Sequence, residues 1–180
     1  PPEHGVEFRS DDGHSLRAGS RAKVELTGGV VAGTNPNPVE ALAIVQAVHA
    51  LVQDGGDKLP SIGIVTFNDP QRQLIEDLLH ASKNSKVIDV MDETKMGQGE
   101  VLFIKALEQV QGDERDTIVF SIAFSKQANG KIPTNFGPLS TSGGERRLNV
   151  AVTRARRKNI IYCSFEPGEL DVTGSTYNGP

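Results

Sequence analysis

The chain has 180 residues, which suits one domain with one substantial core. Its hydrophobic content of 37% and charged content of 23% are ordinary for a globular domain, and the net charge of −4 excludes a wholly basic surface. Its single cysteine, Cys163, excludes an internal disulfide, and no apolar run is long enough to span a bilayer. We therefore expect a protein of the reducing cytoplasm.

The first part of the chain contains two predicted helices around one predicted strand. Segment 1–33 is rich in glycine, serine and charge and is predicted to be irregular or a hairpin. Asn37 is placed to cap a helix, Glu40 completes a capping-box spacing, and the apolar stripe comprises Leu42, Val45, Val48 and Val52. The apolar run 62–67 is typical of a buried strand, and a second helix follows it.

The second part is predicted to add several strands and one basic helix. The strand candidates are short apolar runs at 87–91, 101–107, 117–123 and 159–165. A long polar loop, 125–144, leads to the basic segment 145–157, and a tail follows at 167–180. Because strands alternate with helices, the sequence predicts an α/β domain over 34–166 with a mainly parallel sheet covered on both faces.

The basic segment 145–157 combines arginines with an apolar stripe at helical spacing, formed by Leu148, Ala151, Val152 and Ala155. Arg147 and Arg154 lie about two turns apart and would project along one neighbouring face. Rigidly held guanidinium groups suit phosphate oxygens. The alternative is a basic helix that only faces solvent.

A polar motif, Val110-Gln-Gly-Asp-Glu-Arg-Asp116, precedes the apolar run 117–123. Gly112 would allow a ligand to approach the backbone closely, and Glu114 can accept hydrogen bonds from sugar hydroxyls. Taken alone, the motif is explained equally well by a solvated connection between strands.

These motifs, with Ile62-Gly-Ile-Val-Thr-Phe-Asn-Asp-Pro-Gln-Arg72 before them, resemble motifs IV, V and VI of superfamily 1 helicases. The similarity covers roughly 35–165 and is greatest to large bacterial proteins whose motif VI reads like RRLNVAVTRAR. The chain contains no Gly-x-x-x-x-Gly-Lys-Ser/Thr phosphate loop. The resemblance therefore implies the second of two RecA-like domains, a three-layer fold, in an ATP-dependent helicase.

In such a helicase ATP lies between the two domains, and the first domain supplies the phosphate loop and the Mg²⁺ ligands. The resemblance implies Arg154 as the arginine finger, with Arg72 as a second catalytic arginine. A solvent-facing helix residue is the alternative for Arg72. The implied ATP contacts are Gln111, Gly112, Glu114 and Arg147.

The resemblance also implies nucleic-acid contacts, with DNA favoured over RNA. Thr66, Phe67 and Asn68 follow the motif IV strand, although a strand-terminal aromatic such as Phe67 more often belongs to the core. Arg156 can contact phosphate or simply complement a helix end. No metal site is implied, because the acidic run 87–93 lies after motif IV, where the family has no magnesium motif. The competing hypothesis is a non-catalytic RecA-like module that binds nucleotide or a partner.

Overall fold

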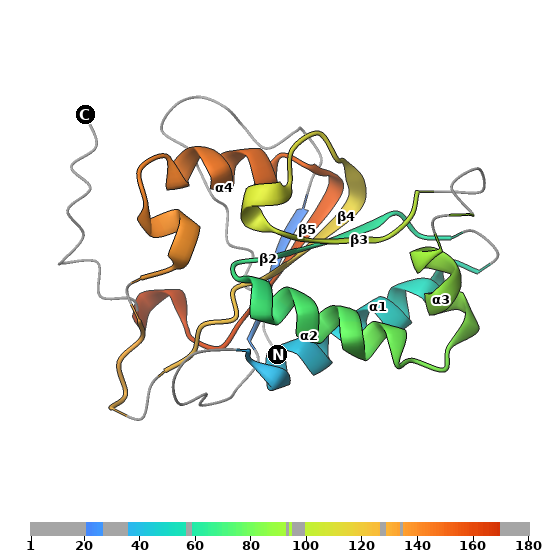
Figure 1. Ribbon diagram of the computed structural model, residues 1–180, viewed down its shortest axis with the longest axis horizontal. Helices are drawn as coiled ribbons and strands as arrows, with labels where there is room; N and C mark the ends of the chain where they lie inside the picture. Colours follow the sequence, from blue (N-terminus) through green and yellow to red (C-terminus); the bar gives the residue numbers. More distant parts are fainter. Residues whose placement is uncertain are drawn as a thin grey trace.

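The computed structural model describes residues 21–26, 36–56, 59–92, 94, 100–126, 129–133 and 135–169. Within these residues, five parallel strands form one sheet in the order β1-β5-β4-β2-β3 (Figure 1). The strands are β1 Arg21–Leu26, β2 Ile62–Thr66, β3 Phe103–Ala106, β4 Arg115–Ser121 and β5 Ala155–Cys163. The predicted strands at 62–67, 117–123 and 159–165 are therefore neighbours at the centre of the sheet, as expected from the sequence.

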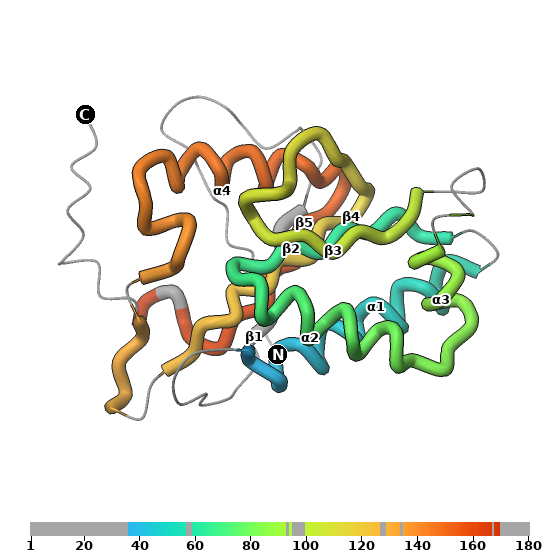
Figure 2. The backbone as a smooth tube through the Cα atoms, in the orientation of Figure 1, coloured from blue at the N-terminus to red at the C-terminus, as the bar shows by residue number. Residues whose placement is uncertain are grey.

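Helices cover both faces of this sheet (Figures 1 and 2). One face carries α1 Pro38–Asp54, α2 Asp69–His80 and α3 Ser85–Met91, and the other carries α4 Gly144–Val152 beside the short helix η2 Leu107–Gln109. The predicted three-layer, RecA-like α/β architecture is thus confirmed. Among the helices that the structure describes, none has the length and apolarity needed to cross a bilayer.

The core consists of two hydrophobic layers, because successive residues of a strand point to opposite faces of a sheet. Ile62 and Ile64 of β2 pack toward α1, α2 and α3, where the buried partners include Ile44, Val48, Ile75 and Leu79. Val65 of β2 and Phe120 of β4 pack instead with Ala151 of α4. The sheet is therefore held rigidly from both sides.

Two local predictions are wrong. Residues 87–91 form helix α3 rather than a strand, because Asn84 caps the backbone of Lys86 and the buried Val87 and Val90 are spaced by three residues. A short apolar run does not distinguish these two structures by periodicity. Leu42 of α1 is also 49% exposed, since Ala41 and Ile44 occupy the inward face of that helix.

The predicted basic helix ends earlier than expected. Helix α4 stops at Val152, Thr153 is its C-cap, and Ala155 already begins β5. Arg147 and Arg154 therefore do not share one helical face, and Arg156 belongs to a strand rather than to a helix end. The apolar residues of this segment belong to two different elements, Leu148, Ala151 and Val152 to α4 and Ala155 to β5. Their spacing fits a helix throughout, so the sequence predicted too long a helix.

Residues 21–26 fall in the segment that was expected to be irregular or a hairpin. They form β1, which pairs in parallel with β5 at the margin of the sheet. The other residues of segment 1–33 and most of the tail at 167–180 lie outside the described residues.

The start of α4 requires a glycine at position 144. A Cβ atom on Gly144 would lie 2.1 Å from the backbone oxygen of Leu139, which belongs to the short helix η3 Gly137–Ser140. We expect Gly144→Ala to lower the free energy of unfolding by about 1–3 kcal/mol, because the backbone must move to relieve the overlap. Urea denaturation measures this change. Gly168→Ala is the matched control, since nothing lies within 4 Å of its Cβ position, and equal stability of the two variants would contradict the expectation.

Candidate functional site

The parallel sheet has two edges with different residues. We call the edge where the strands begin the amino edge, and it contains the segments around Ser61, Glu114 and Arg154. The edge where the strands end is the carboxyl edge, and it contains Thr66 to Asn68 and the first turn of α2. Residues predicted for one shared site are distributed between these two edges.

The structure brings Glu114 and Arg154 together at the amino edge. Arg115 and Ala155 are paired across β4 and β5, and the Arg115 amide donates a hydrogen bond of 3.1 Å to the Arg154 carbonyl oxygen. Glu114 and Arg154 immediately precede these paired residues. The two residues that the resemblance assigns to one ATP site therefore lie at the same edge of the sheet.

The Arg154 side chain lies against the last turn of α4. Its Nε donates to the Val150 carbonyl oxygen at 2.9 Å and its Nη2 donates to Thr153 Oγ1 at 3.2 Å. Asn159 Nδ2 donates to the Val152 carbonyl oxygen at 3.1 Å and so fixes the end of the helix. Among the described residues, no carboxylate forms an ion pair with Arg154, so no opposite charge has to be separated when its guanidinium moves.

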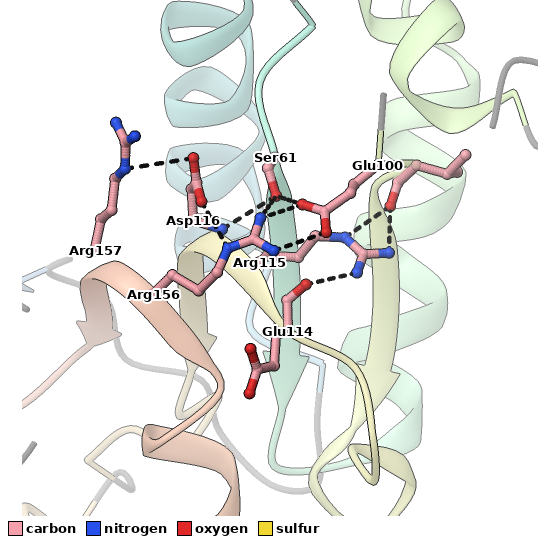
Figure 3. A network of polar contacts seen from close by, with 8 residues as sticks. Ser61, Glu100, Glu114, Arg115, Asp116, Arg156 and Arg157 are labelled. Carbon is pink, nitrogen blue, oxygen red and sulfur yellow. Dashed lines mark hydrogen bonds and ion pairs between the residues drawn. The ribbon is translucent and has the colours of Figure 1, made fainter. Parts of the chain in front are cut away.

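The loop between η2 and β4 carries the remaining predicted amino-edge residues. Gln111 and Gly112 are exposed, and Gly112 has a φ of 91°, a conformation that favours glycine. Glu114 is half-buried, and its carboxylate points away from the neighbouring arginine cluster (Figure 3). The loop therefore presents an exposed backbone and an acidic side chain beside Arg154.

The neighbouring cluster is centred on Arg156. Its Nε donates to Asp116 Oδ1 at 2.8 Å, its Nη1 donates to Glu100 Oε1 at 2.8 Å, and its Nη2 donates to Ser61 Oγ at 3.0 Å (Figure 3). Hydrogen bonding from Arg156 lowers the pKa of Glu100 to about 2, and Glu100 and Asp116 raise the pKa of Arg156. Arg156 was predicted either to contact phosphate or to complement a helix end, and in the structure its guanidinium donates to Asp116, Glu100 and Ser61.

Two other predicted arginines lie away from Arg154. Arg147, in the first half of α4, donates through Nη1 to the Pro138 carbonyl oxygen at 3.1 Å and to Thr141 Oγ1 at 2.9 Å. Arg72 lies in α2, beyond the carboxyl edge of β2, and forms ion pairs of 2.7 Å with both Asp69 and Glu76. The hydrogen bond that Arg72 donates to Asp69 is the main cause of the raised Arg72 pKa. The structure does not bring either arginine to the amino edge.

At the carboxyl edge, the predicted nucleic-acid residues support the fold locally. Thr66 Oγ1 donates to the Asn68 carbonyl oxygen at 2.9 Å, and Asn68 Oδ1 accepts from the Gln71 amide at 2.9 Å to cap α2. Phe67 is 5% exposed and packs in the core below α4. For Phe67, the core alternative agrees with its burial.

Sequence reasoning missed a buried polar network at the same edge. Glu40 Oε1 accepts from Ser121 Oγ at 2.6 Å and from the Ala123 amide at 2.8 Å, while Ala123 holds a φ of 67°. The Asn37 amide donates to Gln71 Oε1 at 2.7 Å. In a capping box, that amide would instead donate to the Glu40 carboxylate. Burial raises the pKa of Glu40 to about 7. A glutamate at capping-box spacing gives no sign that its carboxylate will enter the core.

Comparison with known proteins adds the family. Residues 18–166 match the family model described as AAA domain. The chain is 36% identical over 146 residues to an uncharacterised ATP-dependent helicase of Mycoplasma genitalium, covering 81% of this chain and 12% of that protein. It is 40% identical over 130 residues to the corresponding helicase of Mycoplasma pneumoniae, covering 71% of this chain and 11% of that protein.

A plant relative is also similar to this chain. Over 125 residues the chain is 31% identical to a DNA replication ATP-dependent helicase/nuclease of Arabidopsis thaliana, covering 69% of this chain and 8% of that protein. The chain thus spans 12% or less of the length of these three relatives. Because the family model matches residues 18–166, the chain belongs to the AAA domain family, and it is similar to one part of several ATP-dependent helicases.

Proposed function

We propose that this chain is the second RecA-like motor domain of a superfamily 1 ATP-dependent helicase. It would supply Arg154 and Glu114 to an ATP site that a first domain completes. The observation that carries the proposal is the backbone hydrogen bond between Arg115 and Arg154, which holds the two proposed ligands at one edge of the sheet. The helicase relatives support the reaction class.

Arg154 is proposed to act on the phosphates. Its guanidinium rests on neutral oxygen acceptors of Val150 and Thr153, so it can turn toward the γ-phosphate without breaking an ion pair to any residue that the structure describes. A planar, delocalised guanidinium stabilises the charge that spreads over the equatorial oxygens during phosphoryl transfer. Mg²⁺, with its ligands proposed on the first domain, would supply the remaining charge neutralisation at the β- and γ-phosphates.

Glu114 is proposed to position the sugar. Its carboxylate accepts hydrogen bonds from ribose hydroxyls, and the exposed backbone at Gln111 and Gly112 lets the nucleotide approach closely. Arg72 and Arg147 are omitted from this ATP site, because the first lies beyond the carboxyl edge and the second is bound to the loop before α4. Each of these two arginines is left out because of the position of the helix that carries it.

Nucleic acid is proposed to bind along the carboxyl edge near Asn68, where α1 and α2 both begin. Helix N-termini attract phosphate oxygens through their unpaired amides and partial positive charge. DNA is proposed as the polymer, because the name of the Arabidopsis relative specifies DNA replication. A yeast relative named as a putative RNA helicase has a lower identity of 27%.

The proposal predicts that the 180-residue chain alone hydrolyses no ATP and binds it weakly, because only one wall of the site is present. The complete helicase should show ATPase activity that nucleic acid stimulates. Isothermal titration calorimetry on the chain and phosphate-release assays on both proteins test this expectation. A complete protein with its phosphate-loop lysine replaced controls for contaminating ATPases.

Robust turnover by the purified chain would contradict the two-domain proposal. The competing hypothesis, a non-catalytic nucleotide- or partner-binding module, predicts a different result. In that case the complete protein would bind nucleotide without any turnover that nucleic acid stimulates.

A further inference from the structure

The pairing of β4 with β5 contains an irregularity next to the proposed ATP residues. Arg115 pairs with Ala155, whereas Thr117 pairs with Lys158, so Asp116 alone lies opposite both Arg156 and Arg157. One residue against two is a β-bulge, which increases the local twist and redirects side chains. Side-chain contacts at such a bulge reinforce the register that backbone pairing and buried residues set.

Asp116 supplies those contacts. Its two carboxylate oxygens receive Arg156 Nε at 2.8 Å and Arg157 Nε at 3.6 Å (Figure 3). Its backbone amide donates to Ser61 Oγ at 3.1 Å. Both arginines of the bulge are thereby directed to a single carboxylate on the neighbouring strand.

Arg156 extends the contacts across the amino edge. Beyond Asp116 on β4, it reaches Ser61 before β2 and Glu100 before β3. Arg115 is anchored separately, because its Nε and Nη2 donate to the Val101 carbonyl oxygen at 3.0 and 2.7 Å. The beginnings of β2, β3, β4 and β5 are therefore tied into one frame.

This frame lies directly beside Glu114 and Arg154, the residues that are proposed to bind ATP. Glu114 lies just before β4, two residues before Asp116, and Arg154 lies just before β5, two residues before Arg156. A slip of one residue in the pairing would turn the side chains beyond the bulge to the opposite face of the sheet. The frame thus has the position needed to set where Glu114 and Arg154 point.

The side chains of the frame are partly exposed, so their contacts should affect side-chain orientation more than the stability of the fold. The side chains of Arg156, Asp116 and Glu100 are 34%, 33% and 40% exposed, and ion pairs this exposed contribute little net stability. Hydrogen bonds from one guanidinium to two carboxylates nevertheless impose a defined geometry. Losing the frame should therefore change orientation more than folding.

We infer that Arg156, Asp116 and Glu100 form a positioning clamp that sets the orientation of Arg154 and Glu114 in the ATP site. This inference rests on the proposed function and reassigns Arg156 from nucleic-acid contact to a positioning residue. Arg156 acts through its neighbours, because its Nε, Nη1 and Nη2 donate to Asp116, Glu100 and Ser61.

The test uses the complete helicase with Arg156→Lys, and with Asp116→Asn as a second variant of the same clamp. We expect each to lower kcat for nucleic-acid-stimulated ATP hydrolysis by about 10- to 100-fold, since a displacement of about 1 Å at a catalytic group has effects of this size. Melting temperature should change little. Glu169→Gln is the matched control, because Glu169 pairs with Lys126 at a similar exposure of 38%.

A double-mutant comparison identifies the route of the effect. In an Arg154→Ala background, Arg156→Lys should cause a much smaller further loss of kcat, because only its effect through Glu114 is left. A merely structural role would lower kcat by the same factor in both backgrounds. Equal factors, or a normal kcat in both clamp variants, would overturn the inference.

A readout without nucleotide separates this inference from the proposed function. In the 180-residue chain, Asp116→Asn should speed hydrogen exchange at the Arg115 amide by about tenfold, because that amide bonds to the Arg154 carbonyl oxygen beside the clamp. Unchanged exchange would overturn the clamp. A wild-type helicase without stimulated ATPase activity would instead overturn the proposed function.

Discussion

In the complete helicase, Arg154→Ala is expected to reduce nucleic-acid-stimulated ATP turnover by about 10³–10⁵-fold, the range found for arginine fingers in phosphoryl transfer. Nucleic-acid binding should remain nearly unchanged. The physical reason is that a finger acts on charge that develops in the transition state, so its loss lowers kcat more than ground-state affinity. Steady-state ATPase kinetics, together with fluorescence anisotropy of labelled DNA, measure the two effects separately.

Arg154→Lys is the discriminating variant. It should restore little activity, because an ammonium group cannot reproduce the planar fork of donors. If Arg154 only braces the end of α4 through Val150 and Thr153, both substitutions would instead lower the melting temperature and spare turnover in the folded fraction. A stable Arg154→Ala enzyme with normal turnover would refute the finger.

Stability should depend on pH through Glu40, whose pKa is raised by burial from 4.5 to about 7 in the folded protein. Below pH 4.5 the carboxyl is protonated in both states. Between pH 4.5 and 7 the folded state keeps a proton that the unfolded state releases, so the free energy of unfolding falls as pH rises. The loss amounts to about 3 kcal/mol in total, at about 1.4 kcal/mol per pH unit, and levels off above the folded-state pKa.

Glu40→Gln provides the control for this prediction. Glutamine does not titrate, and its amide oxygen can still accept hydrogen bonds from Ser121 and Ala123. Urea denaturation of both proteins across this pH range isolates the contribution of Glu40, since all other titrating groups are common to them. Parallel stability curves for wild type and Glu40→Gln would contradict the raised pKa.

Local signals in the sequence predicted most of the element positions. Asn37 placed the beginning of α1 within one residue, because capping depends on side chains and amides only a few positions apart. Strands 62–67, 117–123 and 159–165 were recognised as short apolar runs and are central in the sheet. The failures at 87–91 and at the end of α4 share a cause, since short apolar segments satisfy more than one periodicity.

The α/β class and the central position of three strands could be predicted from the sequence, because they follow from apolar segments that alternate with helices. The grouping of Glu114 with Arg154 came from the resemblance to helicase motifs. Only the tertiary structure decided the roles of Arg156 and Glu40. Arg156 meets Asp116 and Glu100 across 40 and 56 residues of chain, and Glu40 meets Ser121 across 81. Contacts this distant depend on how strands and helices pack, and the local pattern around a charged residue does not contain that information.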